Sequence, residues 1–509
     1  MIVKVFSSAI IGVDAYPVAV EVDISPGLPQ FSTVGLPDVA VRESKDRIKA
    51  AIKNSGYPFP KTHVTVNLAP ADIKKEGTGF DLPMAVGILA ADGTLGPQPA
   101  QDYLLLGELS LDGSVKGVPG VLSAAFQARA SGKKGIIVPV ENAREAAMVQ
   151  DVGVMPVGNL AEVVEFLSGR RAIEPVVVDA AAVFSQSHRY PFDFKDIRGQ
   201  EQAKRALEVA AAGSHNVLMI GPPGAGKTML AQRLPTILPD LTFPEAVETT
   251  KIYSVAGLLD RKQAFLATRP FRAPHHSISD AGMVGGGHVP HPGEISLAHQ
   301  GVLFLDELPE FRKNTIESLR QPLEDGTVTI SRSLMRTTYP ARFMLIAAMN
   351  PCACGFYGDP RRACRCSPRQ IRQYQGRISG PLLDRIDIHI DVPAVRYREL
   401  AARQTAEPSA AIKARIEAAR RCQRERLPDH PLFTNTRLTD PQLKAFCALD
   451  TESQRLLEMA VDRLGLSARA YTRILKVART IADLESEADI RSPHVAEAIH
   501  YRTLDRALI

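Results

Sequence analysis

The chain contains 509 residues, 45% of them apolar, which is enough for about two to four globular domains with buried cores. Its formal net charge of +5 is mild for this length, so charge alone neither excludes nor indicates binding to nucleic acid. No apolar run reaches the roughly 18 residues of a membrane helix, and Lys4 and Asp14 interrupt the apolar start of the chain. We therefore expect no membrane span and no signal peptide, and we expect a cytoplasmic protein.

The first part of the chain, residues 1–170, has the pattern of a mixed α/β domain. Alternating or wholly apolar short runs predict strands, and apolar residues spaced three and four apart predict helices. Strands are expected at residues 18–24, 63–68 and 135–139, and helices at residues 38–53 and 80–91. Residues 171–192 then pass into a Ser- and Pro-containing stretch that predicts an interdomain linker.

Two further domains are expected after this linker. Between residues 193 and 395 helical patterns alternate with short buried strands, which predicts a parallel α/β sheet. Between residues 396 and 509 strand patterns disappear, and helical periodicity dominates, as in residues 410–421 and 471–482. The predicted fold class is therefore α/β, with an N-terminal α/β domain, a parallel α/β core and a C-terminal helical domain.

A glycine-rich loop between a predicted strand and a predicted helix is the strongest functional motif of the chain. The strand covers residues 216–220 and the helix begins near residue 229, which is the context that a phosphate-binding loop requires. Backbone N–H groups and the helix N-terminus would bind phosphate, Lys227 would reach the β- and γ-phosphates, and the Thr228 hydroxyl would bind Mg²⁺. The loop thus predicts an ATP site made by Gly221, Pro222, Pro223, Gly224, Ala225, Gly226, Lys227 and Thr228.

Two later apolar strands end in polar side chains that would complete this site. The run at residues 302–305 ends in Asp306 and Glu307, and ligands of open α/β sheets bind at the carboxyl ends of strands. Asp306 would hold Mg²⁺ through water, and Glu307 would orient and polarise the attacking water. The run at residues 343–349 ends in Asn350, which would contact the γ-phosphate or that water. Asn is also a common turn residue, so only its position in this order favours the catalytic interpretation.

Four of the six cysteines occur within one short stretch. They form two pairs, Cys352 with Cys354 and Cys364 with Cys366, each separated by one residue. In a chain expected to be cytoplasmic, such a cluster predicts a Cys₄ zinc site within an insertion at residues 352–366 rather than disulfides. Arginines crowd the same region and would suit a DNA backbone or form a solvated rim: residues 361, 362, 365, 369, 372 and 377.

Longer segments around these motifs make the chain similar to a known family. The order of phosphate loop, Asp-Glu and Asn resembles AAA+ ATPases. Residues 270–276, 293–301 and 380–387 resemble the magnesium-chelatase-like branch of that class. Residues 34–44 and 67–77 resemble the ComM (YifB) family within this branch, and the similarity runs nearly from end to end.

The resemblance implies a ring-shaped homohexamer with the nucleotide between subunits. Arg385 matches the arginine finger that reaches a neighbour's γ-phosphate, a contact that contributes about 10³-fold or more in rate. Arg377 is a weaker candidate for the same role, and Arg469 matches the sensor-2 arginine of the helical lid. Residues 328–340 predict a β-hairpin, which in similar motors lines the pore, so Arg332 and Arg336 would face DNA phosphates. A surface hairpin without a partner is the alternative.

The N-terminal domain resembles the ribosomal-S5-type fold of the Lon protease domain. No serine occurs in residues 76–81, where such proteases carry the nucleophile, and Leu122 stands where the partner lysine is expected. We therefore expect no peptidase chemistry and predict a DNA-binding or assembly module. Lys74 and Lys75 are candidate DNA contacts, or alternatively part of a solvated turn.

The resemblance implies an ATP-driven hexameric DNA motor that promotes branch migration on single-stranded and branched DNA. Such a motor would aid integration of DNA during natural transformation. Its cofactors would be ATP, Mg²⁺ and Zn²⁺. Alternatives are a magnesium-chelatase-type motor that inserts metal into porphyrin, a nucleotide-gated scaffold with negligible turnover, and a Lon-type protease, which the absent dyad disfavours.

Overall fold

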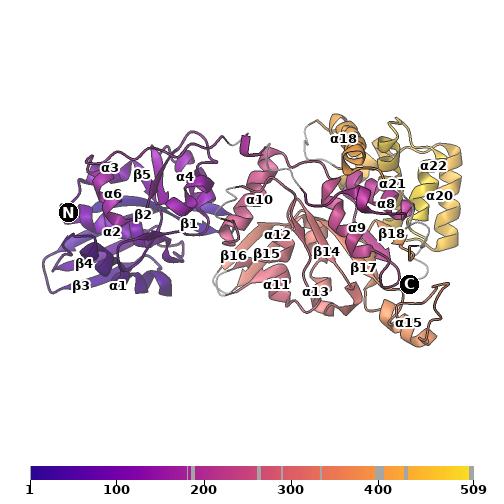
Figure 1. Ribbon diagram of the computed structural model, residues 1–509, viewed down its shortest axis with the longest axis horizontal. Helices are drawn as coiled ribbons and strands as arrows, with labels where there is room; N and C mark the ends of the chain where they lie inside the picture. The colour runs from indigo at the N-terminus through magenta and orange to yellow at the C-terminus, as the bar shows by residue number, and fades with distance from the viewer. Residues whose placement is uncertain are drawn as a thin grey trace. The chain divides into compact units, whose positions relative to one another are not determined.

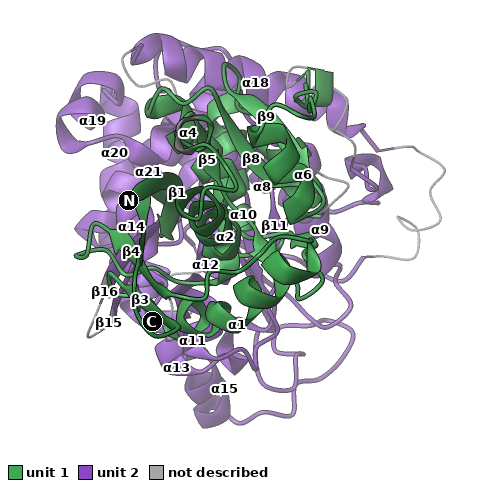
Figure 2. Ribbon diagram, turned by 90° about the vertical axis from the view of Figure 1, so that its left-hand side faces the viewer, with its two compact units in different colours: residues 1–188, 242–267 green, residues 189–241, 268–509 purple. Residues whose placement is uncertain are grey.

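The computed structural model describes residues 2–179, 182–184, 190–260, 265–287, 290–332, 335–395, 406–428 and 434–503 (Figure 1). The chain divides into two compact units (Figure 2), one of residues 1–188 and 242–267 and one of residues 189–241 and 268–509. Both units combine sheets with helices, and the second contains a parallel sheet, so the predicted α/β fold class is confirmed. Within the described ranges no helix combines the length and the apolar character needed to span a bilayer.

The first unit is built on a seven-stranded mixed sheet in the order β3-β4-β2-β1-β5-β8-β9. The neighbours β1–β2 and β2–β4 are antiparallel, and the other neighbours are parallel. Strands expected at residues 18–24, 63–68 and 135–139 are confirmed. The strands are β1 (Val3–Ile11), β2 (Asp14–Ser25), β3 (Gln30–Val34), β4 (His63–Ala69), β5 (Tyr103–Leu105), β8 (Gly135–Pro139) and β9 (Gly153–Val157), with a small hairpin of β6 (Glu108–Leu109) and β7 (Val115–Lys116).

Helices of the first unit cover this sheet. The long amphipathic helix begins where the Asp38 carboxylate accepts the Val41 N–H at 2.8 Å, as an N-cap does. The second helix is buried along almost its whole length and packs on β1 and β2, which explains its apolar sequence. Both helices were predicted. The helices are α1 (Val39–Asn54), α2 (Asp81–Ala91), α3 (Pro97–Gln101), α4 (Val121–Ala130), α5 (Ala143–Ala146) and α6 (Leu160–Leu167), with 3₁₀ turns at Thr78–Phe80 and Val140–Asn142.

Helix α10 (Phe243–Val255) lies in the middle of the chain but packs in the first unit. The backbone N–H of Gly120 donates to the Ser254 carbonyl at 3.2 Å, and the Ser254 hydroxyl donates to the buried Glu145 carboxylate. The sequence analysis assigned residues 242–267 to the α/β core, whereas the structure places them with the N-terminal unit. An apolar helix face shows that the helix is buried, but not which core it covers.

The second unit contains a five-stranded sheet in the order β11-β14-β17-β10-β18, all strands parallel. Its three central strands are buried on both faces, which explains their continuous apolar sequences. The predicted strands before the phosphate loop, before Asp306 and before Asn350 are confirmed as neighbours in this sheet. The strands are β10 (Val217–Ile220), β11 (Phe271–Arg272), β14 (Val302–Leu305), β17 (Met344–Met349) and β18 (Ile388–Asp391).

Two hairpins and a set of helices complete the second unit. The hairpins are β12 (Gly285–Gly286) with β13 (His291–Pro292), and β15 (Thr327–Arg332) with β16 (Met335–Pro340). Helices before residue 395 are α8 (Glu201–Gly213), α9 (Lys227–Arg233), α11 (Asp280–Val284), α12 (Glu294–Leu297), α13 (Lys313–Glu317), α14 (Arg320–Asp325), α15 (Pro368–Gln375) and α16 (Gly380–Leu383). Single 3₁₀ turns lie at Phe194–Asp196, Leu234–Thr236, Leu308–Glu310 and Asn435–Arg437.

The C-terminal part is helical wherever it is described beyond residue 406. Its helices are α18 (Ser409–Arg426), α19 (Asp440–Phe446), α20 (Thr451–Leu464), α21 (Ala468–Leu484) and α22 (Ser492–His500). Apolar residues of these helices share one core with β10 and β18, and the Phe194 N–H donates to the Ser409 hydroxyl at 2.7 Å. The expected helical region therefore packs as part of the same compact unit as the parallel sheet.

Candidate nucleotide site and cysteine cluster

The phosphate-loop sequence connects β10 to α9 with a tight, glycine-dependent backbone. Gly224 and Gly226 have φ of +77° and +91°, which side-chain-bearing residues rarely adopt. A Cβ on Gly221 would lie 2.1 Å from the Val392 carbonyl oxygen, so only glycine fits beside β18. The loop leaves β10 at the carboxyl edge of the sheet and leads directly into the N-terminus of α9, a geometry suited to anions.

Lys227 is the buried cation of this loop. Its ammonium donates to the carbonyls of Gly221 at 2.7 Å and Pro222 at 3.1 Å, and to Oδ1 of Asn350 at 3.2 Å. Burial lowers the pKa of Lys227, while the charges of Asp306 and Glu307 act in the opposite direction. All three hydrogen-bond partners are neutral, so a phosphate oxygen would be a stronger acceptor than any of them.

Thr228 and Asp306 come from different elements and meet at the same edge of the sheet. The Thr228 hydroxyl donates to Oδ2 of Asp306 at 2.7 Å. A hydroxyl and a carboxylate oxygen side by side are suitable first- or outer-sphere groups for Mg²⁺ with a bound triphosphate. The expected pairing of the loop with the acid after β14 is therefore present in the geometry.

Glu307 follows Asp306 in an αL conformation with φ of +52°. Its N–H donates to Oδ1 of Asp306 at 3.0 Å. Oε2 of Glu307 lies 3.7 Å from Nδ1 of His276. A non-glycine residue in this conformation is uncommon and is often found at functional sites.

Asn350 ends β17 beside the loop and is fixed by residues that follow the cysteines. Its backbone hydrogen-bonds the Tyr374 phenol, and Nε2 of Gln375 donates to the Pro351 carbonyl at 3.0 Å. Burial, with the nearby charges of Glu310 and Glu307, raises the pKa of Tyr374 to about 12, so the phenol stays protonated. Asn350 thus presents its amide oxygen to Lys227 from a rigid backbone.

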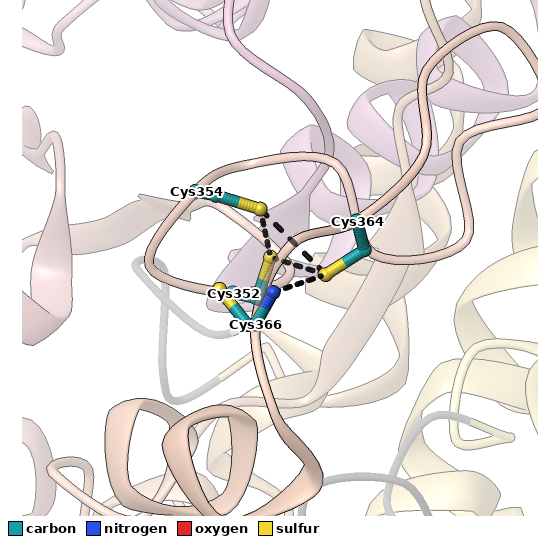
Figure 3. Close-up of side chains that lie close together, drawn as sticks. All are labelled: Cys352, Cys354, Cys364 and Cys366. Atoms are coloured by element: carbon teal, nitrogen blue, oxygen red, sulfur yellow. Dashed lines mark hydrogen bonds between the residues drawn. The ribbon is translucent and has the colours of Figure 1, made fainter.

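The four clustered cysteines converge on one point (Figure 3). Their sulfur atoms all lie within 4.8 Å of one another, and three of the separations are 3.4, 3.6 and 3.7 Å. These values lie close to the about 3.8 Å edge of a tetrahedron with Zn–S bonds of about 2.3 Å. Backbone hydrogen bonds from Arg365 and Phe356 lower the pKa of Cys354 to about 6, whereas desolvation and the neighbouring cysteine sulfurs raise the pKa of Cys364 to about 12 and also raise that of Cys366. The donor set fits a tetrahedral thiophilic metal.

The comparisons with known proteins agree with this geometry. Residues 193–400 match the family model described as magnesium chelatase, subunit ChlI, and residues 20–142 and 406–502 match models for further parts of that subunit. The chain is 46% identical to the protein YifB of Escherichia coli and 45% identical to the competence protein ComM of Haemophilus influenzae. Each of these matches covers 99% of this chain and 98% of the relative.

This chain belongs to the ComM/YifB family of magnesium-chelatase-like AAA+ proteins. A shorter match, 28% identical over 31% of this chain, joins it to half of the magnesium-chelatase 38 kDa subunit of Rhodobacter capsulatus. Membership in an AAA+ family indicates an ATPase, and ATP with Mg²⁺ as its cofactors.

The arginines assigned from the ComM/YifB resemblance lie in three different settings. Arg385 is buried, donates from Nη1 to the Pro381 carbonyl at 2.6 Å and pairs through Nη2 with Glu324 of α14. Arg377 is exposed and pairs with Glu310 at 2.9 Å. Arg469 is 62% exposed, with Nη1 4.0 Å from Asp384. Arg385 is thus held within its own subunit, a position that its sequence did not predict.

The expected hairpin is formed by β15 and β16, and its tip at residues 333–334 lies outside the described residues. Arg336 is exposed opposite Ser331, while the side chain of Arg332 also lies outside the described part. Below the tip, Tyr339 is buried and donates its hydroxyl to the Pro290 carbonyl at 2.6 Å. The hairpin base is therefore anchored in the second unit, and Arg336 faces outward.

The N-terminal unit differs from one expectation of the sequence analysis. Lys75 is fully buried and its ammonium donates to the Pro70 carbonyl, so it is not an accessible DNA contact. Lys74 is partly exposed and pairs with Glu76. Leu122 is buried in α4, at the position where peptidase chemistry would need a lysine as partner of a serine nucleophile.

Three residues near the nucleotide loop were missed. Gln200, at φ of +58°, donates to the carbonyls of Ala225 at 3.3 Å and Pro393 at 2.6 Å and so braces the loop. Tyr374 positions Asn350, and His276 lies beside Glu307. Tyr374 and His276 do not follow from local sequence pattern, because the fold brings them to the site. For Gln200, the Gly199–Gln200 pair before α8 is a weak sequence signal of a turn.

Proposed function

We propose that this protein is a hexameric ATP-driven DNA motor that promotes branch migration of recombination intermediates. The observation that supports it most directly is the meeting of Lys227, Thr228, Asp306 and Asn350 at one sheet edge, from one helix and the ends of two strands. The name of the Haemophilus influenzae relative, competence protein ComM, favours a role in natural transformation, where incoming DNA is integrated.

Each residue of the site has a distinct task in this proposal. Bound Mg²⁺ would neutralise charge on the triphosphate. Gly224 and Gly226 present backbone N–H groups to the phosphates, because Pro222 and Pro223 have none. Lys227 exchanges its neutral acceptors for phosphate oxygens. Thr228 and Asp306 orient the metal, directly and through water. Glu307 takes the proton of the attacking water, and Asn350 contacts the γ-phosphate or that water.

A neighbouring subunit would complete the site. Arg385 would act as the arginine finger and Arg469 as the sensor-2 arginine, each stabilising charge that develops on the γ-phosphate. Since Arg385 pairs with Glu324 in the isolated chain, ring assembly would have to exchange that carboxylate for a phosphate. A mixture of Arg385→Ala and Lys227→Ala proteins tests this, because only a shared site allows the two inactive chains to restore turnover.

DNA is the proposed partner, in single-stranded and branched forms. Arg332 and Arg336 on the β15–β16 hairpin would contact phosphates, and six exposed arginines around the cysteine loop would add to the electrostatic attraction: residues 361, 362, 365, 369, 372 and 377. A Cys₄-bound Zn²⁺ would hold that loop in place, with Cys352, Cys354, Cys364 and Cys366 as ligands.

The deciding experiment measures ATP turnover by the full chain with no DNA, single strand, duplex and four-way junction in parallel. We expect stimulation by DNA, strongest with the junction, and movement of the branch point that requires ATP. If the rate of ATP turnover is the same with and without DNA, and the protein binds no DNA at low salt, the motor hypothesis is wrong. Under that outcome the alternative is a chelatase-type ATPase, which the match to the Rhodobacter capsulatus subunit supports over a third of the chain.

A further inference from the structure

The segment that carries the four cysteines is built into the nucleotide site from several sides. We define residues 351–375 as the cysteine module; it begins directly after Asn350 and ends with α15. Helix α15 starts immediately after the last cysteine, with Ser367 as its N-cap in a capping box with Gln370. The cysteine loop is therefore covalently close both to Asn350, which precedes the module, and to α15, which ends it.

One contact joins the module to the phosphate loop. Gly355 follows Cys354 and its N–H donates to the Cys352 carbonyl at 2.9 Å. A Cβ built on Gly355 would lie 2.6 Å from Cδ and 2.8 Å from Cγ of Pro223, so the backbone of the module rests directly on the ring of Pro223. Pro223 is part of the loop that would bind the phosphates.

Other contacts join the module to Asn350. Its own α15 supplies the Tyr374 phenol to the Asn350 backbone, and Gln375 to the next carbonyl along the chain. Cys352, only two residues beyond Asn350, is fully buried, and its sulfur lies 3.4 Å from that of Cys354. Asn350 in turn accepts from Lys227. The cysteines, the amide and the loop lysine thus form one continuous set of contacts.

The cysteine loop is irregular, and besides its cysteines it is held by contacts such as the hydrogen bonds from the Arg361 guanidinium to the Ala394 and Val395 carbonyls. Between the end of β17 at Met349 and the start of α15 at Pro368, the structure contains no regular helix or strand. The four sulfur atoms converge on one point of this irregular loop, so a metal bound by all four would fix the loop conformation. Anything that fixes this conformation also fixes where Gly355 and Asn350 lie.

From these contacts we propose that the Cys₄ metal site and the nucleotide site are thermodynamically coupled: metal binding shapes the phosphate loop, and nucleotide binding retains the metal. Gly355 and Tyr374 are the positioning residues that carry the coupling. The inference rests on the proposed ATPase site. By linkage, whatever factor the metal adds to nucleotide affinity, the nucleotide adds to metal affinity.

The chain offers a matched pair of glycines for the test. Gly355 and Gly358 lie in the same loop with φ of +86° and +77°, so replacement by alanine strains both backbones similarly. A Cβ on Gly358 meets nothing within 4 Å, whereas one on Gly355 meets Pro223. A difference between Gly355→Ala and Gly358→Ala therefore reports the contact with the phosphate loop and not backbone strain.

The experiment measures release of Zn²⁺ from the full-length protein to a chromogenic chelator, with and without Mg²⁺ and a non-hydrolysable ATP analogue. We expect the analogue to slow release by about fivefold or more in the wild type and in Gly358→Ala, within the usual range of coupling. In Gly355→Ala, zinc stoichiometry should persist while the effect of nucleotide falls below about twofold and analogue affinity weakens.

Each result decides between distinct hypotheses. If the wild type binds the analogue and zinc but releases zinc equally fast in both conditions, the coupling is absent although the proposed ATPase site stands. If Gly355→Ala gives the same results as Gly358→Ala in every measurement, the contact between Gly355 and Pro223 does not carry the coupling between the metal and nucleotide sites. If the wild type binds no nucleotide, or no zinc, the inference fails, and only in the first of these cases does the proposed function fail with it.

Tyr374 provides a second, independent measurement. Tyr374→Phe keeps the ring and removes the hydroxyl that meets Asn350, so we expect kcat to fall by about three- to tenfold with KM and zinc content unchanged. Tyr357→Phe, at an exposed tyrosine of the same loop, is the control and should leave kcat as it is. An unchanged kcat in Tyr374→Phe, or an equal loss in the control, would overturn the positioning role.

Discussion

The N-terminal unit and the ATPase unit both bury charged side chains, but the partners of those charges differ. In the N-terminal unit, the buried Asp81 carboxylate has an ionic partner and accepts from Nε of Arg47 at 2.8 Å. In the ATPase unit, the ammonium of Lys227 is held only by neutral oxygens among the described residues.

This difference separates the Asp81–Arg47 ion pair, which stabilises the fold, from Lys227, which lies in the phosphate loop; buried Lys75 also donates to a neutral oxygen, the Pro70 carbonyl, but it lies in no such loop. A cation whose acceptors are all neutral gains by exchanging them for an anion, because charge-assisted hydrogen bonds are about twice as strong. The ion pair of the N-terminal unit gains nothing by such an exchange.

The largest expected effect tests whether Arg385, buried like the structural charges, nevertheless serves the ligand. We expect Arg385→Ala to lower kcat by about 10³-fold, because the arginine finger would no longer stabilise the developing γ-phosphate charge. Arg377→Ala, at the exposed and weaker candidate, should change kcat by less than about fivefold. The measurement is steady-state ATP turnover with DNA present. Equal losses in the two variants would place Arg385 among the structural charges.

Glu307→Gln should reduce kcat by about 10²-fold or more while ATP binding is retained, because the amide cannot accept the proton of the attacking water. Glu310→Gln, three residues along and paired with Arg377, is the matched control and should hydrolyse ATP at near the normal rate. Turnover and nucleotide binding are measured on the same protein samples. An unaffected Glu307→Gln enzyme would support the nucleotide-gated scaffold instead.

Much of this site was predictable because its parts are local in sequence. An apolar run followed by a characteristic residue predicts each of three parts: the phosphate loop, the acids after β14, and Asn350. Parallel strands bring the ends of such runs to one edge of the sheet. The cysteine cluster was equally local. Tyr374 was not, since it meets a residue 24 positions earlier through the fold of the cysteine module. The burial of Arg385 depends on α14, which its own neighbours do not reveal.

A pH measurement on the N-terminal unit sharpens the structural side of the comparison. Burial raises the pKa of Asp81 to about 6, with Arg47 acting against this, whereas an unfolded aspartate titrates near about 4. The folded unit therefore binds this proton more tightly, and its free energy of unfolding falls as pH rises from about 4 to about 6, by roughly 2 kcal/mol.

Asp81→Asn is uncharged throughout this range and should lack that component of the pH dependence. Thermal unfolding of the full chain at pH of about 4.5 and 7.5 should show a smaller difference in the variant than in the wild type. Asp46→Asn, at an exposed residue of α1, should keep the wild-type difference. The same pH dependence in all three proteins would contradict the assignment to Asp81.

The smallest effect concerns an exposed charge. Arg336→Ala should weaken DNA binding by about three- to tenfold at every sequence and lower the slope of log K against log salt by about one, as loss of one phosphate contact does. ATP turnover without DNA should be unaffected. Binding is measured by fluorescence anisotropy over a range of salt. An unaltered slope would favour a surface hairpin that contacts no DNA.

The excursion of residues 242–267 has a consequence for how the halves of this protein can be separated. The chain passes from one unit to the other three times, at 188/189, 241/242 and 267/268. Deleting all residues after 192 would remove α10 and its hydrogen bonds to Gly120 and Glu145. A stable N-terminal fragment would therefore need that helix to be joined to it by engineering. Three covalent connections therefore join the two units, rather than a single linker.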